Sequence, residues 1–216
     1  MVERKNECVA SNDPQELLQF RAVADQDEWA AGWRLTLCGL CRSGVLGMKW
    51  DAVDLIKGEV RVEAGRVQLD GHRTATDDPK SSASRRTVPV EDIQPGTAAL
   101  LLSLKARQAA DKAKHGAACA ESGYVLVNPI GLPVRPEAYS DRFAVLCRQA
   151  EVPVVGLHDV RHTFATIMHR AGLAPSDAAA LLGHMVAVHL ATYVTPTQKG
   201  ARAAAAGLGV AISEAM

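Results

Sequence analysis

A compact group of ionisable side chains interrupts an apolar part of this 216-residue sequence: His158, Arg161 and His162. Their spacing of three and four residues places all three on one face of a helix. His184 follows 23 residues after Arg161, behind an expected helix end, and Tyr193 lies nine residues further on. A guanidinium binds phosphate oxygens in a bidentate manner, imidazoles transfer protons near neutral pH, and a phenol can act as a covalent nucleophile. Together these groups suit chemistry on a phosphodiester.

Three further cations lie in a polar segment between two strand-like stretches: Lys80, Arg85 and Arg86. A charge cluster of this kind usually forms a solvated turn. A basic turn between strands can also bind backbone phosphates without reading the base sequence. We therefore regard these three residues as candidate DNA contacts.

Four segments, in this order along the chain, resemble the tyrosine recombinase (phage integrase) family: 39–55, 79–89, 157–166 and 181–193. The first is similar to the family's first catalytic box, and the third to its His-x-x-Arg box. The second is similar to the hairpin turn of the family, with Lys80 in the place of the catalytic lysine. In the fourth, His184 and Tyr193 match the second histidine and the nucleophilic tyrosine. The resemblance covers about 13–196.

This resemblance implies a mainly α fold with a small antiparallel β-sheet, like that of a tyrosine recombinase catalytic domain. It also implies an enzyme that carries out site-specific DNA recombination, in the integration or excision of a phage or mobile element. Tyr193 is then expected to attack the scissile phosphate and form a 3′-phosphotyrosyl link, while Lys80 protonates the leaving 5′ oxygen. His158 is expected to act as a general acid and base, and Arg161 with His184 to stabilise charge on the phosphoryl oxygens.

The implied partners are a double-stranded DNA recombination site and further copies of the chain, assembled on DNA as a tetrameric synapse. Because the covalent link conserves the energy of the broken bond, no cofactor is implied, neither ATP nor an obligatory metal. No membrane partner is expected.

The first catalytic box departs from the family pattern at two positions. Members usually read Gly-Leu-Arg-x-x-Glu there, whereas Cys41 and Gly44 occupy the arginine and glutamate positions in this sequence. Arg42 is a poor substitute, because one residue along a helix rotates a side chain by about 100°. We therefore expect attenuated recombination. The alternative is a catalytically silent DNA-binding relative of a recombinase.

Other interpretations of the same residues are weaker. His158 and His162 have the spacing of a zinc-binding helix, with His184 as a third ligand, but a zinc site leaves the lysine, arginine and tyrosine unexplained. Cys38 and Cys41 have the spacing of a redox dithiol, but no βαβ unit precedes them. We interpret Cys38 as a core residue. The simplest alternative for His158 and Arg161 is an ordinary helix with a buried histidine and a surface arginine, and the simplest alternative for Tyr193 is a packed ring.

These residues must be positioned by a mostly helical scaffold. Alternating apolar residues and turn signals predict one small antiparallel sheet at about 54–90 and a short strand at 124–127. The helix start at Asp13-Pro14 and hydrophobic periodicity elsewhere predict the helices. Helices are predicted over about 13–23, 27–39, 45–50, 95–114, 136–150, 158–171 and 175–182, around 193 and from about 199.

Composition limits the location and the partners. Lys+Arg and Asp+Glu both total 24, so the formal net charge is zero. Residues 1–30 contain seven acids and three bases, so the remainder carries a net charge of +4 and can form a local basic surface. No segment approaches the about 18 apolar residues of a membrane span, and the N-terminus lacks a signal-peptide pattern. With five scattered cysteines, these features favour the cytoplasm of a bacterial host, with nucleoid association when DNA is bound.

We divide the sequence into a leader at 1–12, a catalytic domain at 13–196 and a C-terminal tail helix at 197–216. The tail is rich in alanine and has few large apolar residues, and in the resembled family this segment docks on a neighbouring subunit. Members usually carry an additional N-terminal DNA-clamping domain. The sequence is therefore expected to be an isolated catalytic domain or a truncated relative.

Overall fold

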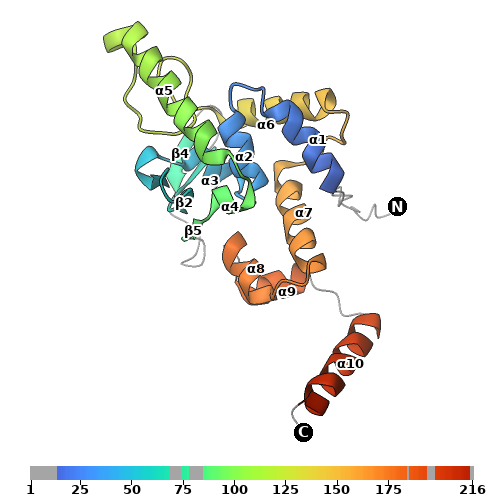
Figure 1. Ribbon diagram of the computed structural model, residues 1–216. Coiled ribbons are helices and arrows are strands. Elements are labelled where there is room, and N and C mark those ends of the chain that lie inside the picture. The colour runs from blue at the N-terminus through green and yellow to red at the C-terminus, as the bar shows by residue number, and fades with distance from the viewer. Residues whose placement is uncertain (1–13, 69–73, 78–84, 184, 194–197, 215–216) are drawn as a thin grey trace, which may run out of the picture.

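The computed structural model describes residues 14–68, 74–77, 85–183, 185–193 and 198–214. The expected helix cap at Asp13, the leader, Lys80 and His184 lie outside these ranges. The architecture is mainly helical with small antiparallel sheets along one edge (Figure 1), as the sequence predicted. The helices are α1 (Pro14–Ala24), α2 (Ala30–Leu37), α3 (Arg42–Gly47), α4 (Val90–Ile93), α5 (Thr97–His115), α6 (Pro136–Gln149), α7 (Leu157–Arg170), α8 (Pro175–Leu182), α9 (Val186–Tyr193) and α10 (Gln198–Glu214). The strands are β1 (Val53–Asp54), β2 (Glu59–Val62), β3 (Gly65–Gln68), β4 (Thr74–Asp77) and β5 (Arg86–Val88), and short 3-10 helices lie at Trp50–Ala52 (η1) and Gly116–Ala118 (η3).

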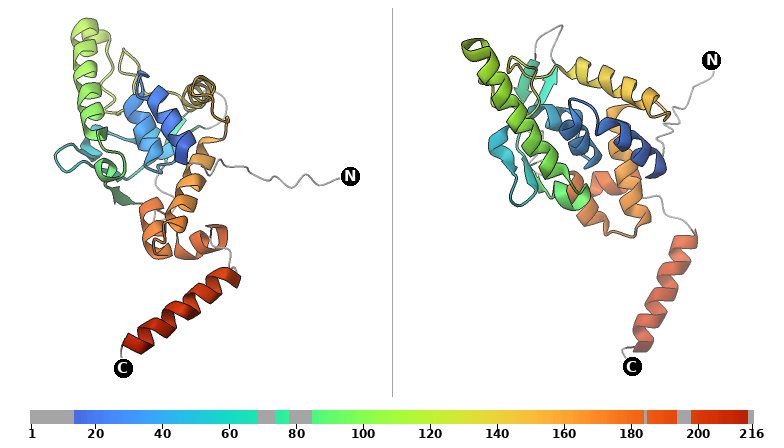
Figure 2. Two further views of the ribbon diagram at one scale, coloured as in Figure 1. Left: turned by 45° about the vertical axis from the view of Figure 1, so that its right-hand side comes forward. Right: turned by 45° about the horizontal axis from the view of Figure 1, so that its top comes forward.

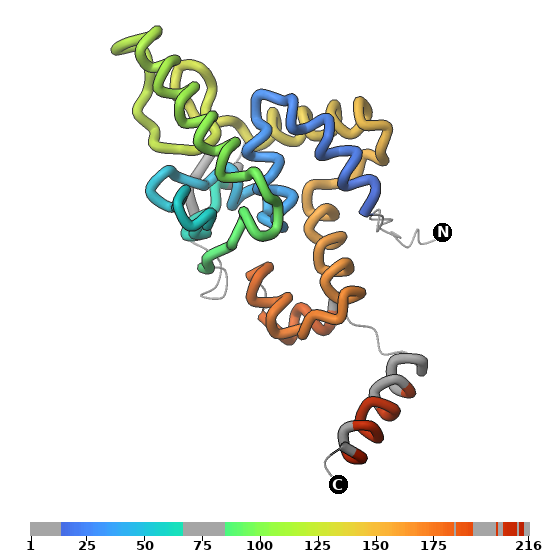
Figure 3. The backbone as a smooth tube through the Cα atoms, viewed as in Figure 1, coloured from blue at the N-terminus to red at the C-terminus, as the bar shows by residue number. Residues whose placement is uncertain are grey.

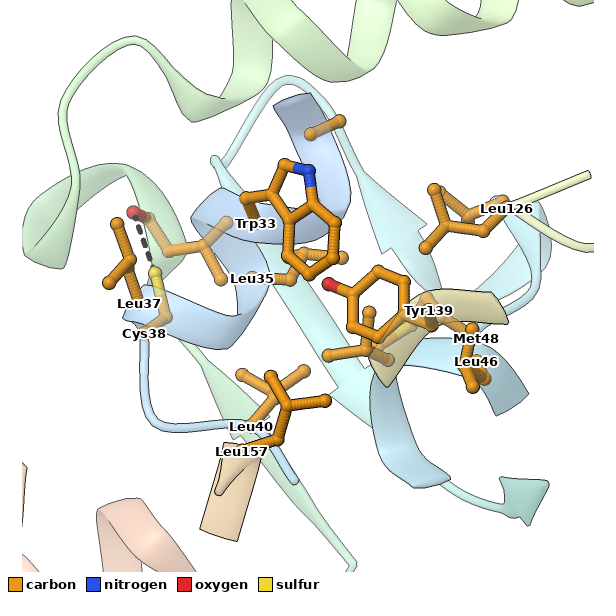
Figure 4. Close-up of a cluster of buried hydrophobic side chains, with 14 of the residues drawn as sticks. Trp33, Leu35, Leu37, Cys38, Leu40, Leu46, Met48, Leu126, Tyr139 and Leu157 are labelled. Atoms are coloured by element: carbon orange, nitrogen blue, oxygen red, sulfur yellow. Dashed lines mark hydrogen bonds between the residues drawn. The ribbon is translucent and has the colours of Figure 1, made fainter. Parts of the chain in front are cut away.

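The core is built around α2, in which every residue is buried. Trp33 stacks on Tyr139 of α6 (Figure 4), and the two ring centroids are 4.0 Å apart. The polar atoms of both rings are satisfied inside the core: Trp33 Nε1 donates to Asp27 Oδ1 at 2.8 Å, and the Tyr139 and Thr36 hydroxyls bond at 2.9 Å. Burial of two large aromatic rings with satisfied polar atoms gives α2 and α6 one well-defined packing.

A three-stranded antiparallel sheet with the order β1-β2-β5 covers one edge of this core. Gly58 has a φ of +67°, which lets the chain turn tightly between β1 and β2. Val60 pairs with Val53 on one side and with Val88 on the other, and both Val60 and Val88 are fully buried. The sheet thus fixes β5 next to the core.

The expected single sheet is in fact two, because β3 and β4 form a separate antiparallel pair. A Cβ atom on Gly47 would lie 2.9 Å from the Ala64 carbonyl oxygen and 3.0 Å from the Arg66 nitrogen. The end of α3 is therefore pressed directly on the backbone at the start of β3. Both edges of β2 are already paired, one with β1 and the other with β5, so β3 pairs with β4 instead.

The strand expected at 124–127 is reduced to isolated bridges, Lys49 with Tyr124 and Val127 with Pro133. The Val125 N–H donates to the Met48 carbonyl, but the chain after Lys49 turns into η1. No extended partner is therefore available along the described part of this segment, and the ladder cannot continue.

The helices α7, α8 and α9 form the lower part of the body in the view of Figure 1, and they contain the C-terminal half of the sequence motifs. At the start of α7 the Asp159 carboxylate accepts the Gly156 N–H at 2.8 Å, which caps the helix. A small cluster of buried side chains joins α7 to α8: Ala165, Met168, Ala178 and Leu182. Gly183 ends α8 with a φ of +67°.

α10 lies apart from the body that α1–α9 form, in all views (Figures 1–3). Its large apolar residues Leu208, Val210 and Ile212 are exposed. No helix in the described ranges combines the length and the apolar composition that a bilayer crossing requires.

Candidate active site

Arg161 is buried on α7, and its guanidinium joins three segments of the chain. Nη1 donates to the Gly39 carbonyl at 3.0 Å, and Nη2 donates to the Leu182 carbonyl. Gly39 ends the turn after α2 with a φ of +80°, which directs its carbonyl toward α7. Hydrogen bonds to carbonyl oxygens satisfy donors of a charged group that is only 6% exposed.

Arg86 extends from β5 to the same end of α8. Its Nε donates to the Leu181 carbonyl at 2.6 Å, one residue before the carbonyl that holds Arg161. Carbonyls at a helix C-terminus carry partial negative charge, which attracts both cations. Burial and the nearby charge of Arg161 lower the pKa of Arg86 to about 10, against a smaller opposing effect of Cys41. The two guanidiniums therefore lie close enough to repel each other.

Cys41 precedes the first residue of α3 and lies within the field of both arginines. Its Sγ is 3.2 Å from Ser43 Oγ. Burial alone raises the pKa of the Cys41 thiol, whereas hydrogen bonds with Ser43 and the Gly44 backbone lower it. The charges of Arg161 and Arg86 also lower this pKa, and the net result lies below the ordinary value for a thiol.

Gly44 and Arg42, two other residues of the first box, have different surroundings. A Cβ atom on Gly44 would be 3.4 Å from Cys41 Sγ and 3.7 Å from Val62 Cγ1, an ordinary contact distance. Arg42 is exposed, and its Nη1 donates to Ser140 Oγ of α6 at 2.7 Å. This bond holds Arg42 against α6.

His158 is exposed in the first turn of α7, and its ring meets that of His162 edge-on with centroids 4.5 Å apart. Burial lowers the pKa of His162, and the charges of His158 and Arg161 lower it further. A groove with a volume of about 500 Å³ runs beside His158 and Cys41. Its other lining residues include Arg42, Ser43, Ser140 and Gly156.

Tyr193 is the last residue of α9, which packs against α7 and α8. His189 of the same helix is buried at 1% exposure and helps to fix α9 on these two neighbours. The structure thus brings together Arg161, Arg86 and Cys41 and places His158 on the adjoining groove. It locates Tyr193 by its backbone, while Lys80 and His184 lie outside the described residues.

The zinc interpretation concerned His158, His162 and His184. In the ranges that the structure describes, no group of three or more His, Cys, Asp or Glu side chains is placed to hold a metal ion. Cys38, from the rejected dithiol, is buried in the core, with its Sγ 3.7 Å from the Val90 carbonyl oxygen.

Arg85 and Arg86, which the sequence offered together as DNA contacts, lie in different surroundings. Arg85 is exposed, whereas Arg86 is half-buried beside Arg161. Strand alternation would have distinguished them, because Arg86 is two residues before the buried Val88 and therefore points to the same face of β5. That signal was present in the sequence.

Residues 26–199 match the sequence pattern of the Phage integrase family. The chain belongs to this family, the tyrosine-type site-specific recombinases. A similar curated protein is a "Tyrosine recombinase XerC-like" of Caldanaerobacter subterraneus subsp. tengcongensis, 29% identical over 175 residues. That match covers 74% of this chain and 44% of the relative, so the chain spans less than half of the relative's length.

Two solved structures show the same fold. The Tn1549 transposon integrase, in complex with transposon right end DNA, has a TM-score of 0.72 and 21% identity, over 91% of this chain and 65% of its own. The XerA recombinase has a TM-score of 0.61 and 18% identity, over 88% of this chain and 61% of its own. Both are longer than this chain, which corresponds to less than two thirds of each.

Proposed function

We propose that this chain is the catalytic domain of a recombinase that breaks and rejoins DNA at specific sites, in the integration or excision of a phage or mobile element. One observation carries this proposal: the convergence of two arginines from different elements at the end of α8, next to the helix that ends at Tyr193. Paired guanidiniums suit a phosphodiester, whose charge grows on the phosphoryl oxygens during transfer.

In the proposed reaction the Tyr193 oxygen bonds to the scissile phosphorus, and the bond from phosphorus to the 5′ oxygen breaks. Lys80 gives a proton to the leaving 5′ oxygen, and His158 acts as a general acid and base. Arg161 and His184 stabilise the phosphoryl oxygens. Rejoining reverses these steps with a 5′-hydroxyl as the nucleophile, so the covalent link conserves the bond energy and no ATP or metal takes part.

The rate of this reaction is proposed to be attenuated. A thiol at Cys41 provides no fixed cation, and Gly44 provides no carboxylate. Loss of one preorganised donor typically costs a factor of about 10²–10³ in rate. Cleavage is therefore expected to be slow, while DNA affinity depends on many other phosphate contacts and falls little.

The partners in this proposal are a double-stranded DNA site and further copies of the chain in a tetrameric synapse. The Tn1549 integrase, of similar fold, was solved with transposon right end DNA, which supports the first partner. The domain is proposed to span 13–196, with the tail at 197–216 docking in trans. The proposed location is the bacterial cytoplasm, on the nucleoid when bound.

A second candidate function is that of a silent DNA-binding relative, which the residues at positions 41 and 44 favour. A suicide DNA substrate that traps the covalent intermediate separates the two candidates on a denaturing gel. We expect a protein–DNA adduct that disappears in Tyr193→Phe and persists in the matched control Tyr124→Phe. DNA retention in a gel shift without any adduct would instead identify a silent binder.

A further inference from the structure

The two arginines at the end of α8 are held by separate supports. Arg161 reaches the Leu182 carbonyl from α7, and Arg86 reaches the adjacent Leu181 carbonyl from β5. β5 is itself fixed in the sheet by its pairing with β2, in which Thr87 lies opposite Arg61. The position of Arg86 is therefore set by the fold and does not depend on Arg161.

Holding two guanidiniums close together is unfavourable unless an anion neutralises them. Burial and the charge of Arg161 both lower the pKa of Arg86. Arg161 is 6% exposed, and like charges placed side by side in this way are typical of a functional anion site. Arg86 is only half-buried, so an anion has access to it.

The residue influenced by both cations is Cys41, at the position where the resembled family has its first arginine. Cys41 and Gly44 are both small, and the Gly44 Cβ position is 3.4 Å from Cys41 Sγ. Much smaller groups thus replace the arginine and glutamate side chains of the family pattern. Arg86 comes from the sheet to the carbonyl next to the one that holds Arg161.

We propose that Arg86 supplies the second guanidinium to the scissile phosphate, in the role that an arginine at position 41 has in the family. This inference rests on the proposed function. Arg86 donates hydrogen bonds to the non-bridging phosphoryl oxygens as their negative charge grows, while Arg161 does the same from α7. No covalent bond to Arg86 forms, and no proton is transferred from it.

The test uses the full chain and compares Arg86→Gln with the control Arg107→Gln, an exposed arginine of α5. The rate of adduct formation is measured on two suicide substrates, one with an ordinary scissile phosphate and one with an uncharged methylphosphonate there. On the phosphate, Arg86→Gln should reduce the rate by about 10²–10³, and Arg107→Gln should leave it nearly unchanged. On the methylphosphonate the defect of Arg86→Gln should become much smaller, because less charge needs to be stabilised.

If Arg86→Gln only weakened the hydrogen bond between β5 and α8, the rate of adduct formation would fall by the same factor on both substrates. Since the comparison is made within one protein preparation, it is insensitive to partial unfolding, and Arg86→Lys tests whether a cation without the bidentate geometry suffices. Adding Cys41→Arg should increase the rate in both backgrounds, and more in the Arg86→Gln background, where it also replaces the guanidinium that was removed.

Two negative results have different meanings. If the natural chain forms an adduct and Arg86→Gln equals it, or is equally slow on both substrates, the role of Arg86 is wrong and the proposed function stands. If the natural chain binds DNA but forms no adduct on either substrate, the proposed catalytic function fails, and the role of Arg86 fails with it.

Discussion

Cys38 and Cys41 lie three residues apart, and their surroundings give the two thiols opposite character. Cys38 is 3% exposed in the core, and burial raises its pKa to about 12. Cys41 is near Arg161 and Arg86, and its pKa lies below the ordinary value. Only the thiolate is nucleophilic, so the local field decides which of the two reacts.

We predict that Cys41 is alkylated faster than Cys38 by iodoacetamide near neutral pH, by at least about tenfold given the direction of the two pKa shifts. Inorganic phosphate or DNA should slow the reaction of Cys41, because an anion between the arginines removes the field that favours the thiolate. Mass spectrometry of peptides after timed labelling measures both rates, with Cys41→Ser as the control. Equal rates that phosphate does not change would show that Cys41 does not lie in an anion site.

Motifs in the sequence identified single candidate residues, but they did not predict the contacts that those residues make in the fold. Spacing and motif singled out Arg161, and periodicity placed it on a helix. The burial of its guanidinium against Gly39, 122 residues away in sequence, followed from no local pattern. Arg86 could have been separated from Arg85 by strand alternation, but its proximity to Cys41 depends on how the sheet meets α8.

At the scale of elements, local sequence signals are sufficient to predict α5, α6 and α8, but not the arrangement of the strands. These helices have strong apolar periodicity or a proline at their start, which are local signals, and the structure confirms them within a few residues. The division into two sheets depends on the pairing of β2 with the distant strand β5, which is a tertiary effect. The bridges at Tyr124 likewise depend on where Met48 lies.

The helix α9 provides a prediction on pH. Burial lowers the pKa of His189, and the charge of His169 on α7 lowers it further. When the pKa of a histidine is lower in the folded state than in the unfolded state, protonation of that histidine destabilises the folded state. The unfolded state then binds the proton more readily, so stability is retained above the ordinary pKa of about 6.5 and is lost as the pH falls below it.

We therefore expect the melting temperature to decrease between about pH 7.5 and pH 5.5, and His189→Gln to reduce this decrease, because the titrating group is then absent. Each variant is compared with itself across pH, so any general loss of stability cancels. His115→Gln, at the end of α5, serves as the control and should keep the full pH dependence. An unchanged pH dependence in His189→Gln would mean that protonation of other groups governs acid stability.

At the scale of the whole molecule, α10 is the element that the rest of the fold explains least. The helix lies apart from the body in every view (Figures 1 and 2). Leu208 and Ile212 are one helical turn apart and are 62% and 54% exposed. Two such side chains on one face, without a core of their own, favour a docking role over a folding role.

Deletion of residues 199–216 tests this role. Removing a helix that lies apart from the body should change the stability of the body by no more than about 0.5 kcal/mol, as surface changes usually do. For a domain of this size that corresponds to a shift of about 2 °C or less in melting temperature. Cooperative assembly on DNA carrying two recombination sites should decrease strongly, because the proposed contact between subunits is lost, while binding to a single site changes little. Native gels with one-site and two-site DNA measure the two kinds of binding separately.

The double variant Leu208→Lys and Ile212→Lys should reproduce the loss of cooperativity, and Ser213→Ala, on the same helix, should not. If the deletion instead unfolds the isolated chain, α10 is part of the folding core and its docking in trans is wrong.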